Sequence, residues 1–209
     1  MGLGLGGIRR MYAGVNRVTT EHCAGDLNMY NNVHNMSTVN LNKAFRALAK
    51  QGGWAVSEAT LRLALGQSVN TFRVLMSRYT KAGEVQRLGQ GIYRNPYLQP
   101  PSWALERLAA RLRPDDSFYV SLESALHEYG RISQIPTRLT LMTTGTSRTF
   151  ETPLGVIEFT HSKRDIHAMR DRMMFLPDRS IHIASEELAL EDLHHTGRNT
   201  GLVLPAEEE

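Results

Sequence analysis

The fold of this chain is decided by residues 57–94, which read SEATLRLALGQSVNTFRVLMSRYTKAGEVQRLGQGIYR. Serines that are favourable at helix N-caps and glycines that are favourable in turns divide this stretch into two helices and a hairpin. The predicted elements are a short helix over 58–65 capped by Ser57, a turn at Gly66, a helix from Gln67 or Ser68 that ends at Gly83, and strands 84–88 and 92–94 around Gly89-Gln90-Gly91.

A further helix is predicted just before this stretch. Apolar residues at positions 41, 44, 45, 48 and 49 follow the three-and-four spacing of one helix face, and Gly52 and Gly53 end the pattern. The resulting order is helix, helix, glycine turn, helix and hairpin. That order is typical of a winged helix-turn-helix, in which the third helix enters the major groove of DNA and the hairpin forms the wing.

The third helix carries the chemistry that this use requires. Phe72, Leu75, Met76 and Tyr79 share one face by their spacing, whereas the remaining face offers amides, hydroxyls and cations without a carboxylate. Asn and Gln can bond adenine, Arg can bond guanine, and hydroxyls with Arg or Lys can hold phosphates. The predicted DNA-binding residues of helix and wing are Gln67, Ser68, Asn70, Thr71, Arg73, Ser77, Arg78, Lys81, Arg87, Gln90 and Arg94.

The charge is distributed unevenly along the chain. Residues 36–98 contain nine Lys and Arg against two Glu, a net charge of +7, whereas residues 99–209 have a net charge of −5 and residues 1–35 of +1. Three prolines lie between positions 95 and 101. These features predict a basic DNA-binding module over 36–98 and an acidic module over 99–209 with a different partner.

The first 35 residues differ from the rest. They are rich in Gly and Asn without helical or strand periodicity, so a disordered extension is predicted for 1–35, and its Gly-x-Gly-x-x-Gly pattern lacks the strand that a dinucleotide site needs. Cys23 is the only cysteine, which argues against a disulfide scaffold. The sequence has neither a signal-peptide core nor a membrane-spanning apolar stretch, so a cytoplasmic protein is predicted.

Residues 99–209 alternate between helical and strand patterns. Ser102 and Ser121 are each expected to cap a helix that follows them, and a further helix is expected over 186–193. Strands are expected over 118–120, 139–144, 149–152, 156–160 and 181–184. The whole chain is therefore predicted to be α+β, with an N-terminal winged helix-turn-helix followed by a larger mixed α/β domain.

This second module has little that indicates catalysis. A restriction-type nuclease would have Glu-x-Lys at the end of a hairpin strand, but Glu158 is followed by Phe159 and Thr160. Glu151, Glu158 and Asp165 could still cluster around a metal. The histidines, including the adjacent His194 and His195, lack metal-ligand spacing. The prediction is a protein that is not an enzyme, with no catalytic residues, metal site or cofactor.

Several short motifs together resemble the AbiEi antitoxins of type IV toxin-antitoxin systems. The resemblance covers about residues 40–195, and the family's usual Pro-Glu-Arg at the start of the late helix is replaced here by Ser-Glu-Glu. The matching motifs are Gly89-Gln90-Gly91-Ile92-Tyr93, Ser124-Ala125-Leu126, Gly130, Gln134-Ile135-Pro136, and Arg138-Leu139-Thr140 with the strand running to Gly145.

The resemblance implies a repressor that binds inverted repeats in its own promoter as double-stranded DNA. It also implies an antitoxin whose C-terminal domain counters a nucleotidyltransferase-like toxin, without requiring a stable complex, and no role at a membrane. Two alternatives stay open: a ligand-responsive winged-helix transcription regulator without a toxin partner, and a metal-dependent nuclease.

Overall fold

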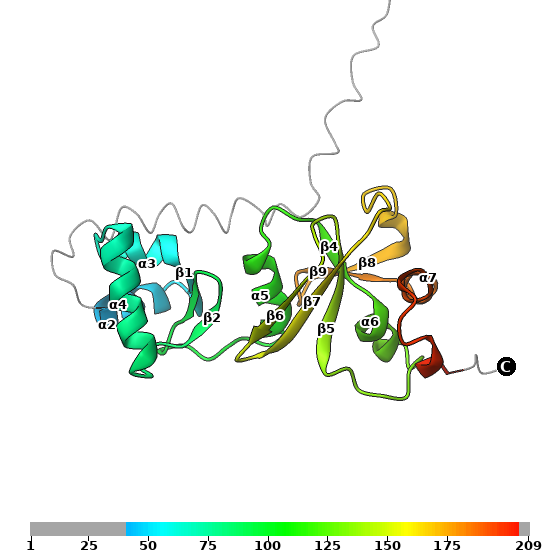
Figure 1. Ribbon diagram of the computed structural model, residues 1–209, viewed down its shortest axis with the longest axis horizontal. Coiled ribbons are helices and arrows are strands. Elements are labelled where there is room, and N and C mark those ends of the chain that lie inside the picture. The colour runs from blue at the N-terminus through cyan, green and yellow to red at the C-terminus, as the bar shows by residue number, and fades with distance from the viewer. Residues whose placement is uncertain (1–40, 205–209) are drawn as a thin grey trace, which may run out of the picture.

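The computed structural model describes residues 41–204 of the chain (Figure 1). These residues form a mixed α+β structure with helices and two β-sheets, as the sequence predicts at the level of fold class. The predicted extension over 1–35 lies outside this range. None of the helices within 41–204 combines the length and hydrophobicity that a bilayer-spanning helix needs.

The first half of the described chain has the predicted helices and hairpin. Its elements are α2 (Leu41–Ala49), β1 (Ala55–Ser57), α3 (Glu58–Ala64), α4 (Val69–Lys81), β2 (Arg87–Gly89) and β3 (Ile92–Arg94). Ser57 caps α3 by accepting a hydrogen bond from the Thr60 amide at 3.1 Å, as predicted. Gly66 adopts a φ of +61° between α3 and α4, a backbone conformation that favours glycine.

One strand of this half was not predicted. β1 is three residues long and runs directly into the cap of α3, so it has too few residues to show an alternating pattern. It completes an antiparallel sheet of order β1-β3-β2, in which Val56 pairs with Tyr93. The predicted hairpin strand over 84–88 is shorter in the structure, and Gly89 belongs to β2 rather than to the turn.

The second half is built around a six-stranded mixed sheet of order β6-β7-β5-β4-β9-β8. Its elements are α5 (Ala104–Leu112), β4 (Phe118–Val120), α6 (Leu122–Glu128), β5 (Arg138–Thr143), β6 (Arg148–Thr152), β7 (Gly155–His161), η1 (Arg170–Arg172), β8 (Met173–Leu176), β9 (Ile181–Ala184), α7 (Glu186–Thr196) and η2 (Thr200–Leu202). β8 was missed in the sequence, where the apolar run 173–176 shows no alternation.

Two predicted caps need correction. α5 is preceded by Trp103 in a left-handed conformation and not capped by Ser102, and no side chain caps it. Ser121 does precede α6, but its hydroxyl donates to Asp192 of α7 instead of accepting from the helix amides. The Ser121 hydroxyl bonds to Asp192 because that carboxylate is buried, and a buried carboxylate needs hydrogen-bond donors from within the protein.

Helices cover both faces of the large sheet (Figure 1). α6 and α7 pack together on one face, whereas α5 and the small sheet lie toward the other. The strand predicted over 139–144 is present as β5, and its residues Leu139 to Thr143 are all buried. A strand covered on both faces buries its polar residues as well, and Thr140 satisfies its hydroxyl by donating to the Ser121 carbonyl at 2.7 Å.

The two hydrophobic cores meet at the small sheet. Val56 and Tyr93 belong to the core of α2, α3 and α4, while their strand neighbours Ala55 and Ile92 belong to the core around the large sheet. This division follows from the strand period of two, which points successive side chains to opposite faces. The small sheet thus packs against both halves of the structure.

Candidate nucleic-acid interface

α4 presents one buried and one exposed face. Phe72 and Met76 are almost completely buried, and Phe72 meets the Tyr93 ring edge-on at 6.1 Å between ring centroids. This contact fixes the helix on the small sheet. Asn70, Arg73, Ser77, Arg78 and Lys81 all lie on the exposed part of the helix. The structure therefore brings these five predicted residues together on one surface.

The predicted residues before and at the start of α4 are partly engaged within the protein. Ser68 caps α4 by accepting from the Thr71 amide at 3.3 Å, and the two hydroxyls are 2.9 Å apart. The side-chain amide of Gln67 donates through Nε2 to the Leu65 carbonyl at 3.3 Å. Ser68 and Thr71 remain exposed, so their hydroxyls face solvent beside Asn70 while holding the helix start.

The cations of α4 differ from those of the second half in their partners. Within residues 41–204, Arg73, Arg78 and Lys81 take part in no ion pair closer than 4 Å, and their side chains are exposed. In the second half, by contrast, several arginines pair with acids, for example Arg131 with Glu186 at 3.3 Å. The α4 surface is therefore available to an anionic ligand.

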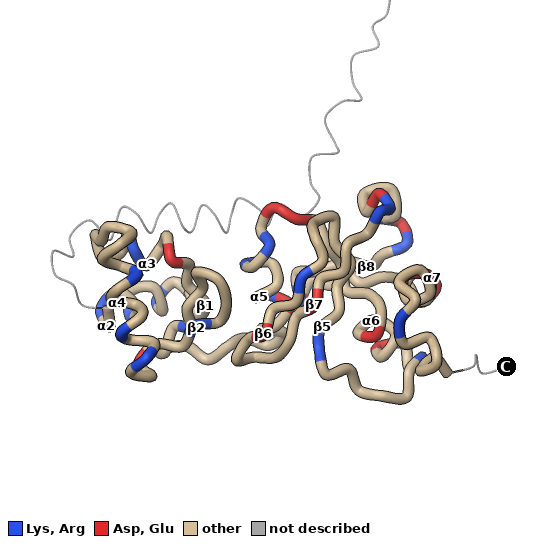
Figure 2. Tube along the Cα trace, in the orientation of Figure 1, with Lys and Arg blue, Asp and Glu red and all other residues tan. Residues whose placement is uncertain are grey.

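The charged residues are distributed differently over the two halves of the structure (Figure 2). Lys and Arg predominate over α2, α3 and α4, whereas basic and acidic residues mix over the large sheet and its helices. All nine cations and both acids of the basic segment fall within described residues 41–98, which therefore keep the net charge of +7. The positive field is concentrated on the half that holds α4.

The hairpin positions its predicted residues unequally. Arg87 is exposed, and its Nε donates to the Gly89 carbonyl at 2.9 Å, while Gln90 is exposed at the tip. Arg94 is half-buried on β3 and donates to the side chains of Gln86 at 3.3 Å and Gln99 at 3.4 Å. The hairpin tip and Arg87 are thus open to a ligand, whereas Arg94 mainly joins the hairpin to the chain that follows.

The carboxylates considered for a metal-dependent nuclease do not assemble. No group of three or more His, Cys, Asp or Glu side chains that could hold a metal occurs among residues 41–204. Glu158 receives hydrogen bonds from Arg138 at 2.8 Å and from Arg198. Burial by itself raises the pKa of Glu158, but these hydrogen bonds and the two positive charges outweigh burial and lower it. Glu158 is therefore part of a structural ion-pair cluster.

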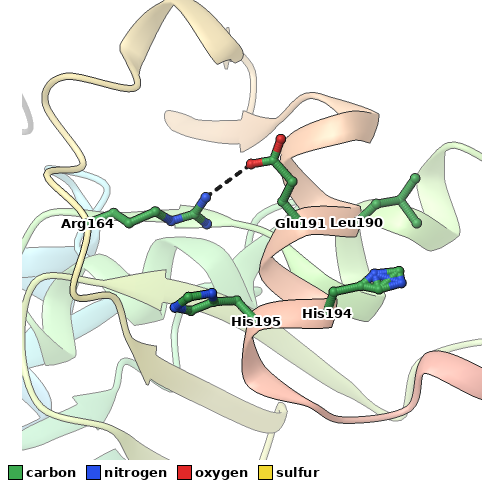
Figure 3. Close-up of a pocket in the computed structure, with 5 residues that line it drawn as sticks. All are labelled: Arg164, Leu190, Glu191, His194 and His195. Carbon is green, nitrogen blue, oxygen red and sulfur yellow. Dashed lines mark hydrogen bonds and ion pairs between the residues drawn. The ribbon is translucent and has the colours of Figure 1, made fainter.

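A shallow pocket of about 490 Å³ lies beside α7 and is lined by Arg164, Leu190, Glu191, His194 and His195 (Figure 3). Arg164 donates to Glu191 at 3.2 Å and also pairs with the buried Asp192. The adjacent histidines point to different sides of α7, because neighbouring residues of a helix are about 100° apart around its axis. The cation of this pocket is thus already neutralised by two carboxylates.

Two buried polar clusters in this half were not found from the sequence. Asp192 accepts from the Ser121 hydroxyl at 2.6 Å and from the Tyr119 hydroxyl at 2.9 Å. Arg179 donates through Nε to both oxygens of Glu106, at 3.0 and 2.9 Å. The partners are more than 70 positions apart in the chain, so no local spacing indicates them. Both clusters tie helices to the large sheet.

Comparison of the chain with models of protein families and with curated proteins gave no match.

Proposed function

We propose that this chain is a winged-helix protein that binds duplex DNA and represses its own promoter. In this proposal α3, the Gly66 turn and α4 form the helix-turn-helix, and the β2–β3 hairpin is the wing. One observation supports this proposal most directly. The exposed face of α4 holds an amide, hydroxyls and three cations, and within residues 41–204 no carboxylate pairs with those cations.

The proposed docking follows from the dimensions of B-DNA. Its major groove is about 12 Å wide and admits one α-helix. With α4 in the groove, Asn70 and Arg73 in its first turns would reach base edges, and Arg78 and Lys81 would lie near phosphates. Arg87 and Gln90 of the wing would contact the backbone beside the groove. The inverted repeats that the AbiEi resemblance implies would be bound by two copies.

The antitoxin function is proposed from the resemblance to AbiEi. In this part of the proposal the second half, with its large sheet and net negative charge, counters a nucleotidyltransferase-like toxin in the cytoplasm. Its cations support a role other than DNA binding, because Arg113, Arg131 and Arg138 are each paired with a carboxylate of the same half. Such pairing leaves less positive potential for a polyanion.

A binding titration of the full chain tests the DNA-binding function. Fluorescence anisotropy with a labelled duplex from the region upstream of its own gene should show saturable binding that weakens with salt. With four to six phosphate contacts, the logarithm of the affinity should fall with the logarithm of salt concentration at a slope of about −4 to −5. Arg148→Ala, which removes an exposed cation of the second half, is the matched control and should leave the slope unchanged. Binding that does not respond to salt would contradict the proposal.

A further inference from the structure

The exposed face of α4 contains one apolar side chain among its polar ones. Asn70, Val74, Ser77 and Lys81 are spaced by four, three and four residues, so they form a single row along the helix. This row lies opposite Phe72 and Met76, which hold α4 in the core. Val74 is 53% exposed in the middle of the row.

Neither packing nor helix formation explains a valine at this position. Val74 belongs to neither hydrophobic core cluster of residues 41–204. A β-branched side chain is also a poorer helix former than the alanine or long polar residues that exposed helix positions favour. Its position between Asn70 and Ser77, one turn away on either side, instead places it where a groove-binding helix meets base edges.

The major groove offers one apolar group to such a side chain, the 5-methyl group of thymine. Asparagine has a complementary preference, because its amide bonds N6 and N7 of adenine. Four helix residues rise by about 6 Å, and successive bases of one strand are about 3.4 Å apart. Asn70 and Val74 are therefore spaced to contact bases one or two steps apart.

We infer that Val74 reads a thymine by contact with its 5-methyl group, next to an adenine that Asn70 reads. This assignment rests on the proposed function and makes it specific: the ligand is B-form DNA with two A·T pairs, one or two steps apart, at the centre of the α4 footprint. Duplex RNA is excluded as an equivalent ligand, because uracil lacks the methyl group and the A-form major groove is too narrow for a helix.

The experiment uses deoxyuridine, which differs from thymidine only in lacking the 5-methyl group of the base. Duplexes bound by the full chain are selected from a random pool, and each thymine of a selected duplex is then replaced singly by deoxyuridine. At one thymine of each half-site, the replacement should weaken binding by the wild type about fourfold, the contribution of one buried methyl group. Val74→Ala should bind the thymine and deoxyuridine duplexes equally.

Val69→Ala is the matched control. Val69 is on the same helix and is 37% exposed, but its five-residue separation from Val74 places it about 140° around the helix. It should keep the wild-type difference between thymine and deoxyuridine. Circular dichroism checks that both variants fold.

The possible failures are distinguishable. If the wild type selects and binds duplexes but tolerates deoxyuridine at every position, the Val74 assignment is wrong and the DNA-binding function stands. The same conclusion would follow if Val74→Ala still bound the thymine duplex more tightly than the deoxyuridine duplex. That includes a variant whose affinity for each duplex falls by the same factor, because the difference between the two duplexes then persists. Absence of any duplex binding would overturn the proposed function and this assignment with it.

Discussion

The buried Asp192 carboxylate accepts a 2.6 Å hydrogen bond from the Ser121 hydroxyl, which links α7 to the turn between β4 and α6. The same carboxylate pairs with Arg164. Asp192→Asn removes the charge and leaves that arginine without its buried partner, so we expect the free energy of unfolding to fall by about 2 to 4 kcal/mol. Ser121→Ala should cost only about 1 kcal/mol, because it removes one hydrogen bond. Urea unfolding measures both, and equal losses would argue against the ion pair as the main contribution.

We expect side chains of α4 to determine which DNA sequence is bound, and side chains of the wing to contribute affinity for any DNA. Arg73 lies in the early turns of α4, so Arg73→Ala should cost about 1 to 3 kcal/mol of binding to the selected duplex and much less on random DNA. Arg87 flanks the wing, so Arg87→Ala should weaken binding to both duplexes alike. Anisotropy titrations on the two DNAs measure this. Equal losses for both variants on both duplexes would refute the assigned roles.

Gly89 has too little room for a side chain. A Cβ built on it would lie 2.5 Å from Cδ2 of Leu112, at the end of α5. The Leu112 methyl group is the end of a flexible side chain that can shift, so Gly89→Ala should lower the free energy of unfolding by only about 1 kcal/mol through overpacking. The double variant with Leu112→Ala removes the clashing atom, and the two changes should be non-additive. Additive losses in urea unfolding would mean that the hairpin does not press against α5.

The ion-pair cluster at Glu158 should make stability depend on pH. Its pKa in the folded state is lower than the value of 4.5 for an unperturbed glutamate. A lowered pKa contributes stability above the unfolded value, and the contribution is lost as pH falls through the folded-state pKa. Glu158→Gln should thus be less stable than the wild type at pH 6, and the difference should shrink as pH falls below 4.5.

Urea unfolding followed by tryptophan fluorescence at several pH values measures this difference. Glu151→Gln is the control, because Glu151 is exposed on the neighbouring β6 and forms no ion pair within residues 41–204. Its stability difference from the wild type should be small throughout. A constant difference for Glu158→Gln across the range would show that the two arginines do not stabilise the charged form.

Repression and toxin neutralisation should be separable by mutation. Changing Asn70 and Arg73 to alanine removes exposed side chains of α4 and leaves the large sheet untouched. If the proposed function is right, the variant should derepress the promoter but still rescue cells from the proposed nucleotidyltransferase-like toxin when both are expressed from inducible promoters. Loss of rescue in a folded variant would mean that protection depends on repression alone.

The sequence predicts those parts of the structure that local chemistry determines. Ser57, Gly66 and Ser68 act within three residues of their own position, so the bounds of α3 and α4 could be predicted. The predicted exposed residues of α4 also share one surface, because helical spacing determines it. Their function as DNA contacts stays a prediction.

The parts that were missed depend on contacts between distant residues. β1 forms because Val56 pairs with Tyr93 on the neighbouring strand, and β8 forms because Met174 pairs with Ile183. The cap at Ser121 was assigned the wrong partner because Asp192 lies 71 positions away. Likewise, division of the chain by charge at 95–101 gave no sign that Ala55 and Ile92 pack with the second half.

The small sheet that packs against both cores constrains how this architecture can evolve. A DNA-reading unit on a free linker can be exchanged between proteins by recombination at the linker. A break between residues 95 and 101 would instead leave Trp54, Leu88 and Ile92 facing water, because they are buried in the core of the second half. A new partner would have to offer an apolar surface shaped like α5. We therefore expect the two halves to be inherited together, and a gene split at this point to yield two fragments that need each other to fold.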